Sequence, residues 1–119
     1  MCGIAGFSSL EETLDLERVS NLLHHRGPDD FGIFEDKENG IGMVHTRLSI
    51  LDTSNKGHQP MKIEDEQVVI VFNGEIYNYR ELRSQLEIEG EVFNGGSDTE
   101  VLLRYYLRHG RNTTDIGVF

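Results

Sequence analysis

A run of apolar residues at positions 68–72, Val-Val-Ile-Val-Phe, limits the possible folds of this chain more than any other segment. It ends at Asn73-Gly74, a pair that favours a turn. A strand that is apolar at every position is expected in the middle of a sheet that is covered on both faces. At 119 residues the chain is long enough for one compact domain with a real core and too short for two.

Three further segments have the pattern of strands. Ile4, Ala5 and Phe7 predict a short buried strand near the N-terminus. Residues 31–35 and 41–45 predict two paired strands, and Asn39-Gly40 between them is the preferred pair for a tight turn. The chain is therefore expected to contain an antiparallel hairpin.

Helices are predicted by one apolar stripe and by two capping boxes. The stripe, which should end before Gly27-Pro28, consists of Leu14, Leu16, Val19, Leu22 and Leu23. The boxes are Asn78 with Glu81 and Ser97 with Glu100, and the two helices that they open are expected to end near Gly90 and Gly110. The two helices that open with capping boxes are expected to pack on the sheet.

The charge balance narrows the range of partners. The chain has 21 acidic and 11 basic residues and a formal net charge of −10, so it should repel polyanions, and neither nucleic acid nor an anionic membrane is expected as a partner. No run approaches the roughly 18 apolar residues of a membrane span, and no signal-peptide pattern is seen. A single cysteine indicates a reducing cytoplasm. The histidines lack metal-ligand spacing, so no metal is expected.

The only cysteine, Cys2, directly follows the initiator methionine. After removal of Met1 it would carry a thiol nucleophile and, in its own α-amino group, a base with an ordinary pKa of about 7.7–8.0. A lone cysteine in a soluble chain is more often a small buried apolar residue. Both interpretations stay open on this residue alone.

Three turn-rich clusters hold the other polar residues with catalytic potential. Asn73, Gly74 and Glu75 place an amide, an unhindered backbone N–H and a carboxylate at one rim, which suits an oxyanion site or a simple turn. Arg47 is either a surface charge or a bidentate partner for a carboxylate. Asp98 is either a favourable acid at a helix N-terminus or an anchor for a substrate ammonium.

Six motifs in order along the chain resemble class II glutamine amidotransferase domains, most closely those of the glutamine-hydrolysing asparagine synthetases. They cover residues 2 to about 107 and are Cys2-Gly3-Ile4-Ala5-Gly6-Phe7, His25-Arg26-Gly27-Pro28-Asp29, His45-Thr46-Arg47-Leu48-Ser49-Ile50-Leu51-Asp52, Gly57-His58-Gln59-Pro60-Met61, Phe72-Asn73-Gly74-Glu75-Ile76-Tyr77-Asn78 and Ser97-Asp98-Thr99-Glu100. Six motifs in family order make a very specific match.

The resemblance implies a fold and a domain organisation. The expected fold class is α+β, a partial αββα sandwich of the N-terminal nucleophile (Ntn) hydrolases, mostly antiparallel sheet with helices, with its second half missing. Residues 2–110 would form the N-terminal part of the amidotransferase domain, and residues 111–119 a divergent tail. Without the later strands the sheet would keep an open apolar edge, which favours self-association or pairing with another chain.

The resemblance also implies a reaction, the hydrolysis of glutamine to glutamate and ammonia through a thioester on Cys2. The implied roles are the following: Asn73 and Gly74 form the oxyanion hole, Arg47 holds the glutamine α-carboxylate with help from the backbone of Leu48, Ser49, Ile50 and Leu51, and Glu75 and Asp98 meet the α-ammonium and amide ends of the substrate.

Family members continue into an ATP-using synthetase domain that spends the ammonia on amide synthesis, as in asparagine biosynthesis. This chain has no Gly-rich phosphate loop, so no cofactor is expected here, and ATP and Mg²⁺ are expected only for a synthetase domain or a partner chain. An alternative from another class is a catalytically inactive, truncated remnant that binds at most ligands or partners.

Overall fold

The computed structural model describes residues 1–49, 54–63 and 68–111 of the chain. The strands are β1 (Gly3–Ser8), β2 (Asp30–Asp36), β3 (Ile41–Arg47), β4 (Met61–Lys62) and β5 (Val69–Ile70). The helices are α1 (Leu16–Leu23), α2 (Tyr79–Ile88) and α3 (Asp98–His109), with 3-10 turns η1 (His24–Arg26) and η2 (Asn55–Gly57).

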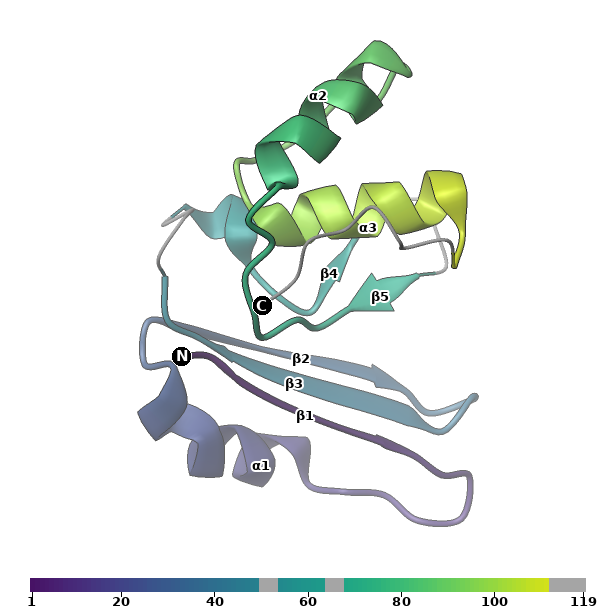
Figure 1. The fold of residues 1–119 in the computed structure, drawn as a ribbon. Helices are drawn as coiled ribbons and strands as arrows, with labels where there is room; N and C mark the ends of the chain where they lie inside the picture. The colour runs from purple at the N-terminus through teal and green to yellow at the C-terminus, as the bar shows by residue number, and fades with distance from the viewer. Residues whose placement is uncertain (50–53, 64–67, 112–119) are drawn as a thin grey trace.

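The elements form layers, as Figure 1 shows. Helix α1 lies on one side of a sheet made of β1, β2 and β3, and β4, β5 and α3 lie on the other side, with α2 beyond α3. Both sheets are antiparallel. The predicted α+β class and the order helix, sheet, sheet, helix are therefore confirmed.

Strand β3 is the centre of the three-stranded sheet, whose order is β1-β3-β2. The predicted hairpin is confirmed, since β2 pairs with β3 so that Phe31 lies opposite Thr46. The hydroxyl of Thr46 donates a hydrogen bond to the Leu23 carbonyl oxygen at 3.1 Å, so Thr46 faces α1. Because side chains alternate along a strand, the neighbouring His45 and Arg47 face the opposite side, toward β4, β5 and α3.

Strand β1 is an edge strand of the described sheet rather than a buried one, and Ile4 on it is 44% exposed. Because an edge strand is covered less completely than a central one, its apolar side chains are only partly buried. The predicted self-association through an open sheet edge stays a prediction.

The prediction of a central strand at residues 68–72 is wrong. Only Val69–Ile70 is a strand, and it pairs with β4 in a separate two-stranded sheet. Beyond it the backbone leaves the ladder, and the Phe72 N–H donates to the side-chain oxygen of Gln59 at 2.7 Å. Consecutive apolar residues reflect a preference for burial, but they do not specify which strands pair with them.

Helix α1 begins one residue after Asp15, whose carboxylate accepts a hydrogen bond from the Arg18 N–H at 3.1 Å. Leu16 is buried, but Leu22, which the predicted stripe includes, is 67% exposed. Each residue turns a helix by about 100°, so position 22 points about 120° away from position 16. Leu14 precedes the helix and is also exposed, so the stripe is narrower than predicted.

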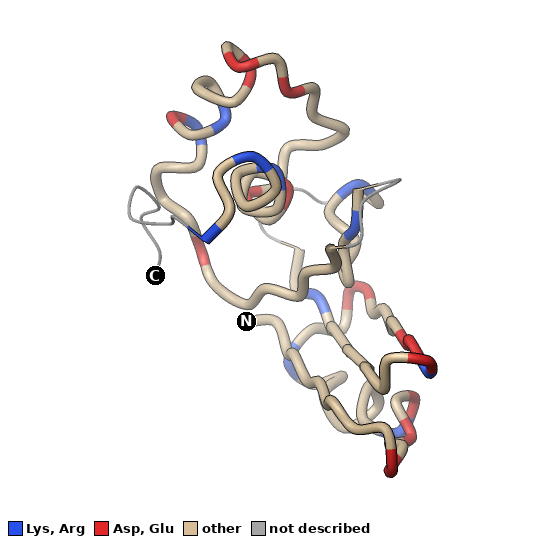
Figure 2. The backbone as a smooth tube through the Cα atoms, turned by 90° about the vertical axis from the view of Figure 1, so that its right-hand side faces the viewer, with Lys and Arg blue, Asp and Glu red and all other residues tan. Residues whose placement is uncertain are grey.

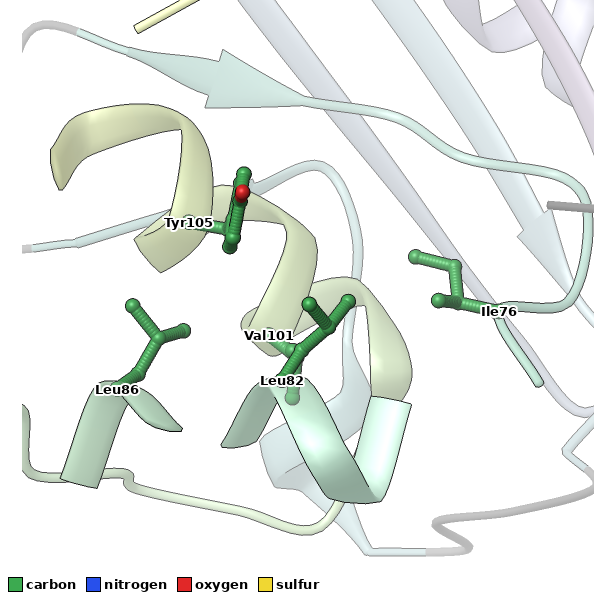
Figure 3. Close-up of a cluster of buried hydrophobic side chains, with 5 residues drawn as sticks. All are labelled: Ile76, Leu82, Leu86, Val101 and Tyr105. Carbon is green, nitrogen blue, oxygen red and sulfur yellow. The ribbon is translucent and has the colours of Figure 1, made fainter. Parts of the chain in front are cut away.

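The two C-terminal helices share a small core, drawn in Figure 3. It consists of Ile76, Leu82, Leu86, Val101 and Tyr105, whose side chains lie between α2, α3 and the segment before α2. Leu86 and Val101 are fully buried. Because Ile76 belongs to this cluster, the chain just before it is anchored on the helices.

The two predicted capping boxes differ in outcome. The Ser97 hydroxyl accepts a hydrogen bond from the Glu100 N–H at 3.2 Å, which confirms the start of α3. The Glu100 carboxylate binds the N–H groups of Asn94 and Gly95 at 2.7 and 2.8 Å instead of reaching back to Ser97. At α2 the Asn78 side chain forms no capping hydrogen bond, because its backbone (φ −95°, ψ 19°) lacks the extended conformation that capping requires.

The acidic residues lie mainly away from the middle of the molecule. Figure 2 shows red positions at both ends, around the turn between β2 and β3 and along α2. Asp36 at the first end and Glu87 at the second illustrate this placement. Many of the described carboxylates therefore lie at the two ends of the molecule (Figure 2).

Candidate active site

A pocket of about 490 Å³ lies where the N-terminus, the end of β3 and the start of α3 meet. Seven of the predicted site residues line it: Cys2, Arg47, Leu48, Asn73, Gly74, Glu75 and Asp98. The other lining residues are Met1, Gly57, Gln59, Phe72, Ser97 and Thr99. Residues as far apart in the sequence as Met1 and Thr99 thus contribute to one cavity.

Of the predicted site residues that the structure describes, Ser49 alone does not line this pocket. The Ser49 N–H donates to the Asp29 carboxylate at 2.9 Å, which ties Ser49 to the loop before β2. Ile50 and Leu51 lie outside the described residues. The predicted divergent tail, residues 111–119, also lies outside them except for Arg111.

Cys2 is partly buried and lies beside the end of β3, because Gly3 pairs with Thr46. The Leu48 N–H donates a hydrogen bond to its sulfur at 3.3 Å, and the Leu48 carbonyl oxygen lies 3.7 Å from the same atom. The backbone of Leu48 therefore holds the Cys2 sulfur at the end of β3 through both its N–H and its carbonyl oxygen.

Arg47 reaches the pocket from the end of β3 and is only 8% exposed. One guanidinium nitrogen, Nη1, donates to the Ser54 carbonyl oxygen at 2.8 Å. No carboxylate forms an ion pair with Arg47 among the residues that the structure describes. A buried guanidinium without an acidic partner is suited to a carboxylate supplied by a ligand.

The guanidinium has room only because position 57 is glycine. A Cβ atom at Gly57 would collide with Nη2 of Arg47. We expect Gly57→Ala to weaken glutamine binding about 10- to 100-fold, since a shift of about 1 Å in a positioning group has effects of this size. Thermal unfolding should change little, because the displaced atoms are the end of a flexible side chain.

Calorimetric titration with glutamine measures this effect. Lys56→Ala, at the exposed neighbouring position, is the control and should bind glutamine normally. Equal affinity in Gly57→Ala and the wild-type protein would contradict the placement of Arg47 at the ligand.

The loop before β2 holds the end of β3 in place. Gly27 lies so close to the backbone of Thr46 and Arg47 that a side chain would not fit there. The Asp29 N–H donates to the Arg47 carbonyl oxygen at 3.0 Å, and the Asp29 carboxylate accepts from Ser49. Asp29 is the last residue of the motif at positions 25–29, and the sequence alone indicated no role for it.

Asn73 and Gly74 lie between two anchored backbone positions. The Phe72 N–H donates to Gln59 at 2.7 Å, and the Ile76 N–H donates to Asp98 Oδ2 at 3.0 Å. Within the described part of the chain, no hydrogen bond engages the Asn73 amide or the Gly74 N–H. Both groups line the pocket, so they can donate to a ligand there.

Asp98 and Glu75 differ in burial. Asp98, the first residue of α3, is 7% exposed, and one of its oxygens already accepts the Ile76 N–H. It therefore has a structural contact in addition to any contact with a ligand. Glu75 is exposed at the mouth of the pocket.

His45 is a buried residue that the sequence analysis did not single out. It is 0% exposed, and neither ring nitrogen has a hydrogen-bond partner among the described residues. Burial lowers the pKa of His45 from 6.5, and the positive charge of Arg47 adds to this effect, whereas the Phe72 backbone and Asp30 oppose it. In the sequence, the only indication that His45 lies near the site is its position two residues before Arg47, which places both side chains on the same face of the strand.

The lowered pKa of His45 predicts a loss of stability in acid. The unfolded chain, with an ordinary pKa of 6.5, binds this proton more readily than the folded protein. The free energy of unfolding should be highest above about pH 7 and fall below about pH 6.5 by up to about 1.4 kcal/mol per pH unit from this group. Urea unfolding measured from about pH 5 to 8 tests this, with His45→Gln as the comparison. Identical pH profiles of the two proteins would refute the prediction.

Among the residues that the structure describes, no group of three or more His, Cys, Asp or Glu side chains is placed to hold a metal ion. None of the described helices has the length and apolar character needed to cross a membrane.

Comparison with known proteins identifies a family. A glutamine amidotransferase domain family matches residues 1–119. The glutamine-hydrolyzing asparagine synthetase 1 of Bacillus subtilis (strain 168) is 49% identical over 116 residues, which cover 92% of this chain and 18% of that protein. The glutamine-hydrolyzing asparagine synthetase of Brassica oleracea is 39% identical over 126 residues, covering 100% of this chain and 21% of that protein.

The glutamine-hydrolyzing nodule asparagine synthetase of Pisum sativum is 36% identical over 126 residues, again with 100% of this chain and 21% of the relative covered. The chain thus spans 18–21% of the length of these three relatives. The match over every residue of the chain leads to one conclusion: it belongs to the glutamine amidotransferase domain family.

Proposed function

We propose that this chain hydrolyses the side-chain amide of glutamine to glutamate and ammonia, with Cys2 as the nucleophile. The observation that carries the proposal is the single pocket lined by Cys2, Arg47, Asn73 and Gly74. It combines a thiol, a guanidinium without an acidic partner among the described residues and two unengaged hydrogen-bond donors. Membership in the amidotransferase family supports the same reaction.

The first step is activation of the thiol. Met1 is 71% exposed at the pocket, and its removal would convert the Cys2 nitrogen into a free α-amine. The Cys2 thiol then transfers its proton to this amine, directly or through water, and the thiolate attacks the amide carbon of glutamine. The Leu48 N–H, 3.3 Å from the sulfur, stabilises the thiolate before the attack.

The second step is collapse of the tetrahedral intermediate. The Asn73 amide and the Gly74 N–H donate to the oxyanion as it develops. The α-ammonium of Cys2 returns its proton to the departing nitrogen, ammonia leaves, and a glutamyl thioester remains. Water attacks the thioester, releases glutamate and regenerates the thiol.

Charge pairing sets the substrate specificity. Arg47 binds the glutamine α-carboxylate through its buried guanidinium. Glu75 and Asp98 receive the α-ammonium and amide ends of the substrate, Asp98 through the carboxylate that also holds Ile76. A ligand without the α-carboxylate leaves the buried guanidinium unpaired, which costs roughly 2–5 kcal/mol.

The ammonia is then used for amide synthesis, as the asparagine synthetase relatives suggest. The acceptor reaction, with its ATP and Mg²⁺, belongs to a synthetase domain or a partner chain, and no step described for this chain uses them. A thiol nucleophile must stay reduced, so the cytoplasm is the compartment that fits this chemistry.

Ammonia release from glutamine tests the proposal, with 4-aminobutanamide as the matched substrate that lacks only the α-carboxylate. We expect turnover of glutamine, and a kcat/KM for the second amide that is lower by about 30-fold to several thousand-fold. Comparable values for the two amides would contradict the role of Arg47. A folded protein that binds glutamine without releasing ammonia would instead be the inactive, ligand-binding remnant.

A further inference from the structure

The segment 72–76 carries both proposed oxyanion donors, and it is tied to α3 at each end. At its end, Asp98 Oδ2 accepts the Ile76 N–H at 3.0 Å. At its start, the Phe72 N–H donates to Gln59 Oε1 at 2.7 Å, and Gln59 Nε2 donates to Thr99 Oγ1 at 3.1 Å. Asp98 and Thr99 are adjacent residues in the first turn of α3.

We propose that Gln59 is a positioning residue that sets the orientation of the Asn73 and Gly74 donors, an inference that rests on the proposed hydrolysis of glutamine. Its amide connects the backbone N–H of Phe72, 13 residues away in sequence, with the side-chain hydroxyl of Thr99, 40 residues away. Through these two hydrogen bonds it fixes the start of the donor segment against α3.

The chemistry of position 59 requires both ends of an amide. Phe72 offers an N–H that needs an acceptor, and in this arrangement Thr99 offers an oxygen that receives a donor, so one carboxamide satisfies both. Gln59 is 6% exposed and Thr99 3% exposed, and hydrogen bonds that are shielded from water hold their geometry more strictly than exposed ones. A residue with only one of the two functions would leave a buried polar group unpaired.

The contacts of Gln59 are distinct from those that hold Arg47. Arg47 is held by Ser54 and has space because of Gly57, and neither contact involves the Gln59 side chain. Loss of the Gln59 amide should therefore disturb the oxyanion donors and leave the carboxylate site in place. The expected signature is a lower kcat with an almost unchanged KM for glutamine, because the donors act mainly on the transition state.

Gln59→Met tests this, since it keeps a side chain of similar length and removes both hydrogen bonds. We expect kcat to fall about 10- to 100-fold, less than the loss of an oxyanion donor itself, and KM to stay within about threefold. Gln85→Met, the same substitution at an exposed position of α2, is the control and should leave both constants unchanged. Rates are normalised to the concentration of folded active sites, which is measured by labelling Cys2 with a thiol-alkylating glutamine analogue.

A double-mutant cycle identifies the path of the effect. If Gln59 acts through the donor segment, Gln59→Met should lower kcat by a smaller factor in Asn73→Ala than in the wild-type protein, because only its effect through Gly74 remains. A full multiplicative loss in the double variant would instead assign Gln59 a general structural role and overturn the proposal.

Thr99→Val provides a second test, which also applies if Gln59→Met does not fold. It keeps the shape of the buried residue and removes only the anchor of the Gln59 amide, so kcat should fall by about 3- to 10-fold at constant KM. If the wild-type protein is active and kcat is unchanged in Thr99→Val, the proposed role of Gln59 is overturned. The same conclusion follows if Gln59→Met folds and keeps the wild-type kcat. A wild-type protein that releases no ammonia from glutamine would overturn the proposed function as well.

Discussion

Cys2→Ala is expected to reduce ammonia release from glutamine to background, a loss of about 10⁴-fold or more, because it removes the proposed thiol nucleophile from the pocket. The methyl group of alanine occupies less space than the thiol and leaves Arg47, Asn73 and Gly74 in position. Glutamine should therefore still bind, with a dissociation constant within a few-fold of the wild-type value. A quenched ammonia assay and calorimetric titration measure the two quantities.

Cys2→Ser is the matched control for the α-amine, which it retains together with a hydroxyl in place of the thiol. It should also be nearly inactive, because a hydroxyl is a much weaker nucleophile than a thiol at neutral pH. Activity above a few per cent of wild type in Cys2→Ala would assign the nucleophile to another residue.

Asn73→Ala is expected to lower kcat by about 100- to 1000-fold, which is the usual effect of removing one oxyanion donor. The KM for glutamine should change little, because the proposed partner of the α-carboxylate, Arg47, lies on a different element. Within the described residues the Asn73 amide supports no other part of the fold by a hydrogen bond, so the melting temperature should be nearly unchanged.

Asn78→Ala is the comparison for Asn73→Ala. It removes an amide five positions further along the chain, at a residue that does not line the pocket, and should keep kcat within about threefold of wild type. Near-normal turnover in Asn73→Ala would remove Asn73 from the oxyanion site.

Local sequence chemistry predicted those elements whose determinants lie close together in the chain. The hairpin of β2 and β3 follows from alternation around Asn39-Gly40, and the start of α3 follows from Ser97 and the N–H three residues later. The prediction for residues 68–72 was wrong because strand pairing depends on partners far away in the sequence. Apolarity alone therefore placed a central strand where the structure has a two-residue strand paired with β4.

The candidate site was predictable only in part from physical chemistry. Arg47, Asn73 and Asp98 each had an ordinary structural interpretation, and the order of the motifs, through the family resemblance, favoured the functional one. The contacts that build the pocket join residues far apart, such as Cys2 with Leu48 and Gln59 with Thr99. No periodicity or local propensity encodes these distances, so Gln59, Thr99 and Gly57 received no role before the structure was seen.

The central claim is that Cys2, as the N-terminal residue, forms a glutamyl thioester. Intact-mass measurement of the protein, acid-quenched during turnover of glutamine and then mapped by peptides, tests this most directly. We expect a chain without Met1 that carries one glutamyl group on Cys2, and no such group in Cys2→Ala. Turnover by a protein that retains Met1, or a glutamyl group on any other residue, would contradict it.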